Sequence, residues 1–132
     1  MSDDFDLARG WFQKAESDWT AAKLVLASRG PYDTACFHAQ QAAEKYLKGL
    51  LVSAGQPFPR PHDLEELQRL GEALIPSWPL RAIDLTELSG YSVQTRYDFE
   101  FWPDHAAAQQ ASELAHEVRR RVLGYVPERA RP

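Results

Sequence analysis

The chain contains a single cysteine, Cys36, among its 132 residues, so it cannot form a disulfide within itself. This excludes the disulfide framework that staples many small secreted domains. The chain also lacks an apolar run of membrane-spanning length. Its first residues, Met-Ser-Asp-Asp-Phe-Asp, are acidic, whereas a signal peptide begins with basic residues and continues with an apolar run. These absences predict a cytoplasmic protein without membrane contact.

The chain also has no excess of basic residues, since 15 lysines and arginines face 19 aspartates and glutamates. The formal net charge is −4, which argues against nucleic-acid binding driven by bulk charge and leaves room for a local basic site. The four histidines do not stand at zinc-ligand spacing with the lone cysteine. The chain has no glycine-rich phosphate loop, no G-x-S-x-G elbow and no H-E-x-x-H motif. We therefore predict no metal site and no cofactor, and these motifs provide no catalytic residue.

Nine prolines divide the chain into five proline-free stretches, and none of them shows the sustained alternation of a strand. Apolar residues recur instead at every third or fourth position, which is typical of helices that bury one face. In the first stretch this apolar seam consists of Phe5, Ala8, Phe12, Ala15, Trp19, Ala22 and Leu26. The stretches predict helices over about 4–29, 32–54, 63–74, 80–97 and 104–125.

This pattern predicts an all-α fold without a β-sheet. A chain of this length usually forms one domain. We expect a single domain over residues 1–126 and a flexible C-terminal tail over residues 127–132.

The second stretch, residues 32–54, has two different faces. At about 100° per residue, one broad arc is small and apolar, so another helix can come close, and Gly49 would help such an approach. The opposite side carries a line of polar residues, which we name the polar stripe: His38, Gln41, Lys45 and Lys48. The stripe would suit an anion such as a phosphate, and a solvated surface or a polar contact between helices would also explain it.

Two further regions could contribute to a site. His62 follows a proline-rich loop and precedes Asp63, the predicted N-cap of the third helix. It is either an ordinary loop residue or a second imidazole near the polar stripe. Residues 91–103 are rich in aromatic side chains and include Arg96. Arginine can bind a phosphate and an aromatic ring can stack on a base, while the same residues could instead cover one end of the bundle or form a dimer surface.

Several of these segments together resemble the HEPN domain, a nucleotide-binding domain of higher eukaryotes and prokaryotes. The resemblance covers the chain from Phe5 to about Leu123. The combination of the second helix with His-Asp-Leu is more specific than each piece alone. The matching segments are His38-Ala-Gln-Gln-Ala-Ala-Glu-Lys-Tyr-Leu-Lys-Gly-Leu-Leu, the following Gly55 and proline loop, His62-Asp63-Leu64, and Arg96-Tyr97.

The resemblance implies an up-and-down antiparallel helical bundle of four to five helices that usually forms a homodimer. It also implies a small prokaryotic protein, often encoded beside a minimal nucleotidyltransferase as a toxin–antitoxin-like pair. Many HEPN proteins are metal-independent RNases in which a histidine follows an arginine after four to six residues. No arginine here precedes a histidine at that gap, because eight residues separate Arg96 from His105 and Arg29 from His38. The resemblance therefore favours the non-catalytic, nucleotide-binding branch of the family.

The leading prediction is a dimeric HEPN-type protein that binds a nucleotide or similar phosphate ligand and works with a nucleotidyltransferase partner. The aromatic residues exceed what a small bundle core needs, so we expect the dimer to bury part of residues 91–102. An RNase toxin with a non-standard Arg and His pair and a non-catalytic structural dimer are the alternatives. We predict that the main site residues converge on one pocket, with His62 near its rim. The predicted ligand-binding residues are His38, Gln41, Lys45, Lys48, His62, Arg96 and Tyr97.

Overall fold

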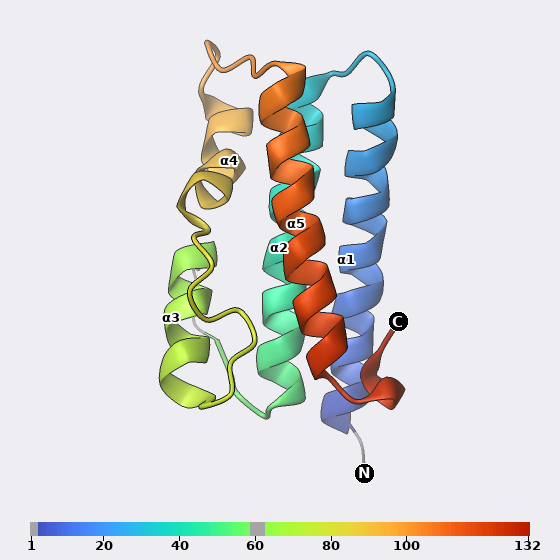
Figure 1. Cartoon of the computed structure of the whole chain (residues 1–132), viewed down its shortest axis with the longest axis vertical. Coiled ribbons are helices and arrows are strands. Elements are labelled where there is room, and N and C mark those ends of the chain that lie inside the picture. The colour runs from blue at the N-terminus through green and yellow to red at the C-terminus, as the bar shows by residue number, and fades with distance from the viewer. Residues whose placement is uncertain (1–2, 59–62) are drawn as a thin grey trace.

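Five α-helices and no strand make up the part of the chain that the computed structural model describes, residues 3–58 and 63–132 (Figure 1). The helices are α1 (Asp3–Ala27), α2 (Tyr32–Ser53), α3 (Leu64–Leu74), α4 (Thr86–Tyr97) and α5 (His105–Tyr125), and a short 3-10 helix, η1 (Glu128–Ala130), follows them. The prediction of an all-α bundle is therefore confirmed. None of the described helices combines the length and apolar character that a membrane crossing requires.

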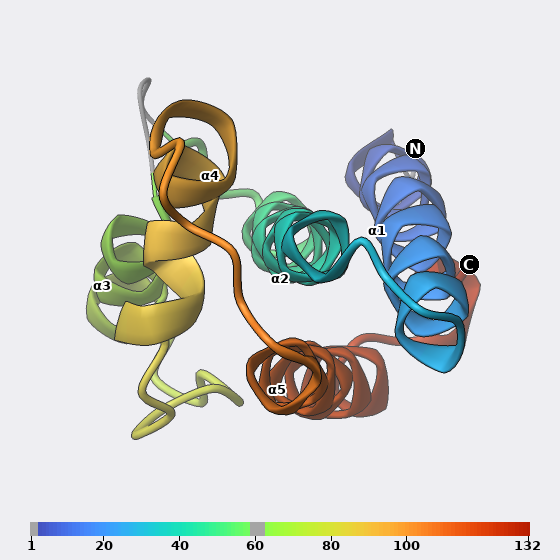
Figure 2. The same cartoon turned by 90° about the horizontal axis from the view of Figure 1, so that it is seen from above.

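Helix α2 lies at the centre of the bundle, with α1, α5 and the pair α3 and α4 around it (Figure 2). Every residue of α2 is buried or half-buried. Its small residues Ala35, Ala39 and Ala42 are almost completely buried, which lets the neighbouring helices approach closely. Within the polar stripe, His38, Gln41 and Lys45 are half-buried and Lys48 is buried.

The apolar seam of α1 packs on α2, as its spacing predicts. Ala8, Phe12 and Ala15 are fully buried, while Phe5 and Trp19 are partly buried against the core. The two helices run antiparallel because only residues 28–31 connect them (Figure 1).

Helices α3 and α5 each begin after an aspartate that caps the first turn. Asp63 accepts a hydrogen bond from the Glu66 amide at 2.8 Å, and Asp104 accepts one from the Ala107 amide at 2.9 Å.

The fourth helix begins at Thr86, six residues later than the predicted start at residue 80. Residues 80–82 form a turn and residues 83–85 have no regular structure, and a side chain outside the segment binds two of their carbonyl groups. Gln68 donates from Nε2 to the carbonyls of Leu80, at 2.5 Å, and Ile83, at 3.3 Å. Its Oε1 atom accepts a bond from Trp78 Nε1 at 2.7 Å. This buried glutamine fixes the connection that places α4 against α2.

The C-terminal residues pack on α1, in contrast to the flexible tail predicted for residues 127–132. Ala130 is fully buried. The Arg129 guanidinium lies 4.3 Å from the centre of the Phe5 ring, and the Arg129 carbonyl accepts a hydrogen bond from Arg9. These contacts depend on the distant partner α1, so the polar composition of the segment alone does not indicate them.

Candidate ligand-binding site

Two residues of the polar stripe meet one carboxylate on α1. His38 Nδ1 lies 2.8 Å from Asp18 Oδ1, and Lys45 Nζ donates to Asp18 Oδ2. All three side chains are buried by more than two thirds. Asp18 therefore compensates the charge of Lys45 and holds α1 and α2 together. This polar contact between helices is one of the alternatives that the sequence left open.

The other two residues of the polar stripe belong to a chain of hydrogen bonds along α2. Gln41 Nε2 donates to Gln40 Oε1 at 2.7 Å, and Gln40 Nε2 donates to Glu44 at 3.1 Å. Lys48 then donates to the second oxygen of Glu44 at 2.7 Å. Lys48 is only 7% exposed, and its ammonium group lies 5.2 Å from the centre of the Trp11 ring. Lys48 is thus a buried ion-pair partner with little surface left for a ligand.

Arg96 lies elsewhere, in a pocket of about 190 Å³ between the end of α4 and the start of α2. We name it the Arg96 pocket, and its lining residues are Asp33, Thr34, Phe37, Thr95 and Arg96. Arg96 Nε donates to the Ser92 carbonyl at 2.7 Å, which fixes the head group. Its two Nη groups have no acceptor among the described residues and can bind an anion.

The predicted convergence of His38, Lys45, Lys48 and Arg96 on one pocket is therefore wrong. Thr34 of the Arg96 pocket and Lys48 stand fourteen positions apart on α2, which corresponds to roughly 21 Å along the helix axis. The His38 ring lies 5.5 Å from the Phe37 ring but does not line the pocket. Tyr97 is exposed beside Arg96, with its ring centre 5.2 Å from the guanidinium carbon. His62 lies outside the described residues.

A model of the HEPN domain family matches residues 8–125. The chain belongs to the HEPN domain family. The match reaches from the first turns of α1 to the last residue of α5, so it covers the whole bundle around α2. Searches of curated proteins and of solved structures gave no match.

The predicted site of this HEPN protein lacks two acidic residues, Asp18 and Glu44. These carboxylates form ion pairs with the lysines of the polar stripe. Glu44 stands four residues before Lys48, and an acid at that spacing from a lysine is a recognised ion-pair signal on helices. Asp18 carries a weaker signal, since it lies beside the apolar seam, three residues after Ala15. Its pairing with His38 depends on how α1 is rotated against α2.

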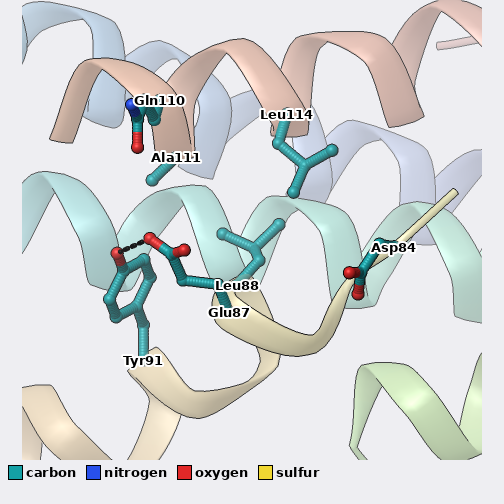
Figure 3. Close-up of a pocket in the computed structure, with 7 residues that line it drawn as sticks. All are labelled: Asp84, Glu87, Leu88, Tyr91, Gln110, Ala111 and Leu114. Carbon is teal, nitrogen blue, oxygen red and sulfur yellow. Dashed lines mark hydrogen bonds between the residues drawn. The ribbon is translucent and has the colours of Figure 1, made fainter. Parts of the chain in front are cut away.

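A second cleft of this HEPN protein, of about 220 Å³, lies between α4 and α5 (Figure 3). The Tyr91 hydroxyl donates to Glu87 at 3.0 Å, and burial together with this hydrogen bond raises the pKa of Tyr91 above its ordinary value. The phenol therefore stays protonated at neutral pH. None of the predicted site residues lines this cleft. In the described part of the chain, no three His, Cys, Asp or Glu side chains come close enough to hold a metal ion.

Arg96 and His105, which do not stand at the RNase spacing of four to six residues, each lie near the first turn of α2. Arg96 lines a pocket with Asp33 and Thr34. The His105 ring packs edge-on against Tyr32, with 5.4 Å between ring centres. Both side chains thus lie near one end of the bundle, although eight residues separate them in sequence.

Proposed function

We propose that this HEPN protein binds a nucleotide or a similar phosphate ligand at the Arg96 pocket. The observation that carries the proposal is the Arg96 guanidinium, which is fixed through Nε while both Nη groups lack an acceptor among the described residues. Thr34 adds a hydroxyl group to the same pocket, whereas the Thr95 hydroxyl already donates to the Tyr91 carbonyl at 2.6 Å. A guanidinium beside a hydroxyl group is suited to a phosphate.

The other residues near this pocket suit the rest of a nucleotide. The Asp33 carboxylate opposes a phosphate placed directly against it but accepts hydrogen bonds from ribose hydroxyls. Tyr97, which is 68% exposed, offers a ring on which a base can stack outside the pocket. A pocket of about 190 Å³ holds the phosphate and the sugar, and leaves the base on the surface.

Calorimetric titration with AMP tests this assignment. Arg96→Gln removes the charged donors and should weaken AMP binding about tenfold or more, because a hydrogen bond to a charged group contributes about 1.5–3 kcal/mol. Arg69→Gln changes an exposed arginine on α3, outside the pocket, and should leave the affinity unchanged. The proposal fails if the native protein binds neither AMP nor a short RNA at millimolar concentration, or if both variants bind as it does.

In this proposal the protein works with a minimal nucleotidyltransferase in a toxin–antitoxin-like pair, as family membership suggests. A reading frame for such an enzyme beside this gene, and co-purification of its product with this chain, are the observations that test the partnership. A chain that elutes alone when both proteins are made together would contradict it.

We further propose that the protein is a homodimer that buries the aromatic surface at the junction of α4 and α5. Phe99 is 85% exposed and Trp102 is 73% exposed, although Trp102 Nε1 donates to the Phe99 carbonyl at 3.0 Å and holds the loop in place. A rigid, exposed aromatic pair is typical of a protein interface.

Light scattering at micromolar concentration should therefore give about twice the 15.0 kDa mass of the chain. Phe99→Glu should reduce the mass to that of the monomer. Leu24→Glu introduces the same charge at an exposed leucine on α1 and should leave the dimer intact. A native monomer, or equal behaviour of the two variants, would contradict this interface.

An RNase with a non-standard pair is the second candidate, favoured by the placement of Arg96 and His105 near the first turn of α2. An imidazole can take the proton of a ribose 2′-hydroxyl while arginine stabilises the charge that develops on the phosphate. RNA cleavage that is lost in both Arg96→Gln and His105→Ala would select this candidate over binding alone.

A further inference from the structure

A further groove lies between α1 and α5, and it shares no residue with the Arg96 pocket. We name it the α1–α5 groove. Its volume is about 390 Å³, which falls within the range of roughly 300–1,000 Å³ that small-molecule sites occupy. The side chains that decide its chemistry are Trp19, Lys23 and Leu26 of α1 and Ser112, Glu113 and His116 of α5.

Trp19, which lines this groove, carries a buried hydrogen-bond donor without an acceptor. Trp19 Nε1 is closed off from solvent and is the one buried side-chain nitrogen or oxygen in the described part of the chain that has no partner. A buried indole N–H normally finds an acceptor, because leaving it unpaired costs free energy. None of the described protein groups supplies one here, so a ligand atom that reached Nε1 would pair it.

The Trp19 ring is also surrounded by basic side chains. Lys23 Nζ lies 3.5 Å from the ring centre and the Arg119 guanidinium carbon lies 4.1 Å from it, while the His116 ring stacks at 5.4 Å. Arg119 forms an ion pair with Glu16, which compensates its charge. Lys23 is exposed and has no carboxylate within ion-pair distance among the described residues. Its ammonium group is therefore available to an anion.

We propose that the α1–α5 groove binds a planar aromatic carboxylate. The aromatic ring packs against Trp19 and Leu26, and the carboxylate accepts hydrogen bonds from Lys23 Nζ and Trp19 Nε1. Because Nε1 is enclosed, groove side chains must shift to admit the ligand, and Lys23 is long and exposed enough to do so. Glu113 at the edge adds a negative charge, which disfavours a doubly charged phosphate more than a single carboxylate.

Titration of the full chain with 2-naphthoate, followed by the tryptophan indole N–H signals in nitrogen-15 NMR, tests this proposal. The chain has four tryptophans, and the signal absent from Trp19→Phe identifies Trp19. The Trp19 signal should shift on saturation with 2-naphthoate. The uncharged 2-naphthamide and inorganic phosphate should each cause a much smaller shift, since one lacks the charge and the other lacks the ring.

Charge variants show whether naphthoate binds in the groove or binds basic side chains anywhere on the surface. Lys23→Met keeps the aliphatic stem and should weaken naphthoate binding about fivefold or more. Lys14→Met alters an exposed lysine of α1 outside the groove and should have no effect. Glu113→Gln removes the opposing charge and should strengthen binding about twofold.

Three results would each overturn the proposal: an unmoved Trp19 signal at millimolar naphthoate, equal binding of the naphthamide, or equal affinity of Lys23→Met and the native chain. All of them are independent of AMP binding at the Arg96 pocket.

Discussion

Gly49→Ala should lower the free energy of unfolding by about 2–3 kcal/mol, although alanine is the better helix former by about 1 kcal/mol. A Cβ atom at position 49 would lie 2.4 Å from Phe12 Cε1 and 2.7 Å from Cδ1. The Phe12 ring is fully buried and stacks on Tyr46 with 6.3 Å between ring centres, so it has no free space to move into. The overpacking of α1 against α2 therefore outweighs the gain in helix propensity.

Gly10→Ala provides the matched control for this measurement. Gly10 also lies inside a long helix, but a Cβ atom there would meet nothing within 4 Å. This variant should be more stable than the native chain by about 0.5–1 kcal/mol. Urea unfolding at equilibrium measures both changes. Equal effects of the two substitutions would show that the close approach at Gly49 does not limit packing.

A double variant tests whether Phe12 is the side chain that meets the new methyl group. Phe12→Leu alone should destabilise the core, because it removes buried ring volume. The double variant Phe12→Leu with Gly49→Ala should lose much less free energy of unfolding than the sum of the two single losses, because leucine leaves room for the new methyl group. Strict additivity would place the source of the Gly49 effect elsewhere.

The sequence was sufficient for the helices because their signals are local. The seam of α1 predicts the buried face that carries Phe12. Asp63 and Asp104 cap α3 and α5 by accepting hydrogen bonds from the amides of Glu66 and Ala107. The start of α4 was not predictable in this way. Gln68, at least twelve residues earlier, binds the carbonyls of residues 80 and 83, and such a contact leaves no periodic pattern.

The candidate site was also predictable only as far as it depends on spacing within one helix. The spacing of His38, Lys45 and Lys48 predicts one polar face of α2, and in the structure each of the three pairs with a carboxylate. Whether their charges are free depends on other residues. Asp18 reaches the polar stripe only because α1 crosses α2 in one particular register, and the position of Arg96 is set by α4. Spacing within one helix contains no information about either.

Glu16→Gln should lower the free energy of unfolding at neutral pH by about 2 kcal/mol. Glu16 Oε1 accepts hydrogen bonds from the fully buried Tyr46 hydroxyl at 2.6 Å and from Arg119 Nε at 2.6 Å. An amide replaces the charge that Arg119 requires and weakens both contacts. This pair connects α1 to α5, so urea unfolding should report the loss as a lower midpoint with an unchanged slope.

The difference between the native chain and Glu16→Gln should also depend on pH. Burial alone would raise the pKa of the Glu16 carboxyl, but hydrogen bonds from Arg119 and Tyr46 and the charge of Arg119 lower it below the ordinary value of 4.5. A carboxyl with a lowered pKa contributes stability that is fully present above its unfolded pKa and is lost as the pH falls through the folded pKa. The difference should therefore be constant from pH 7 to about pH 5.5 and shrink progressively below pH 4.5.

Glu117→Gln is the control, because Glu117 accepts comparable hydrogen bonds from Arg120 and Arg121 at the surface of α5. These bonds lower the pKa of Glu117 to about 2. Solvent screens this surface group, so its replacement should leave the stability at pH 7 nearly unchanged. If Glu16→Gln proves as harmless as Glu117→Gln, or if its effect is the same at pH 3 and pH 7, the charge of Glu16 does not hold α5 against α1. In that case the contacts of the Trp19 ring with His116 and Arg119 would be tested next as connections between these two helices.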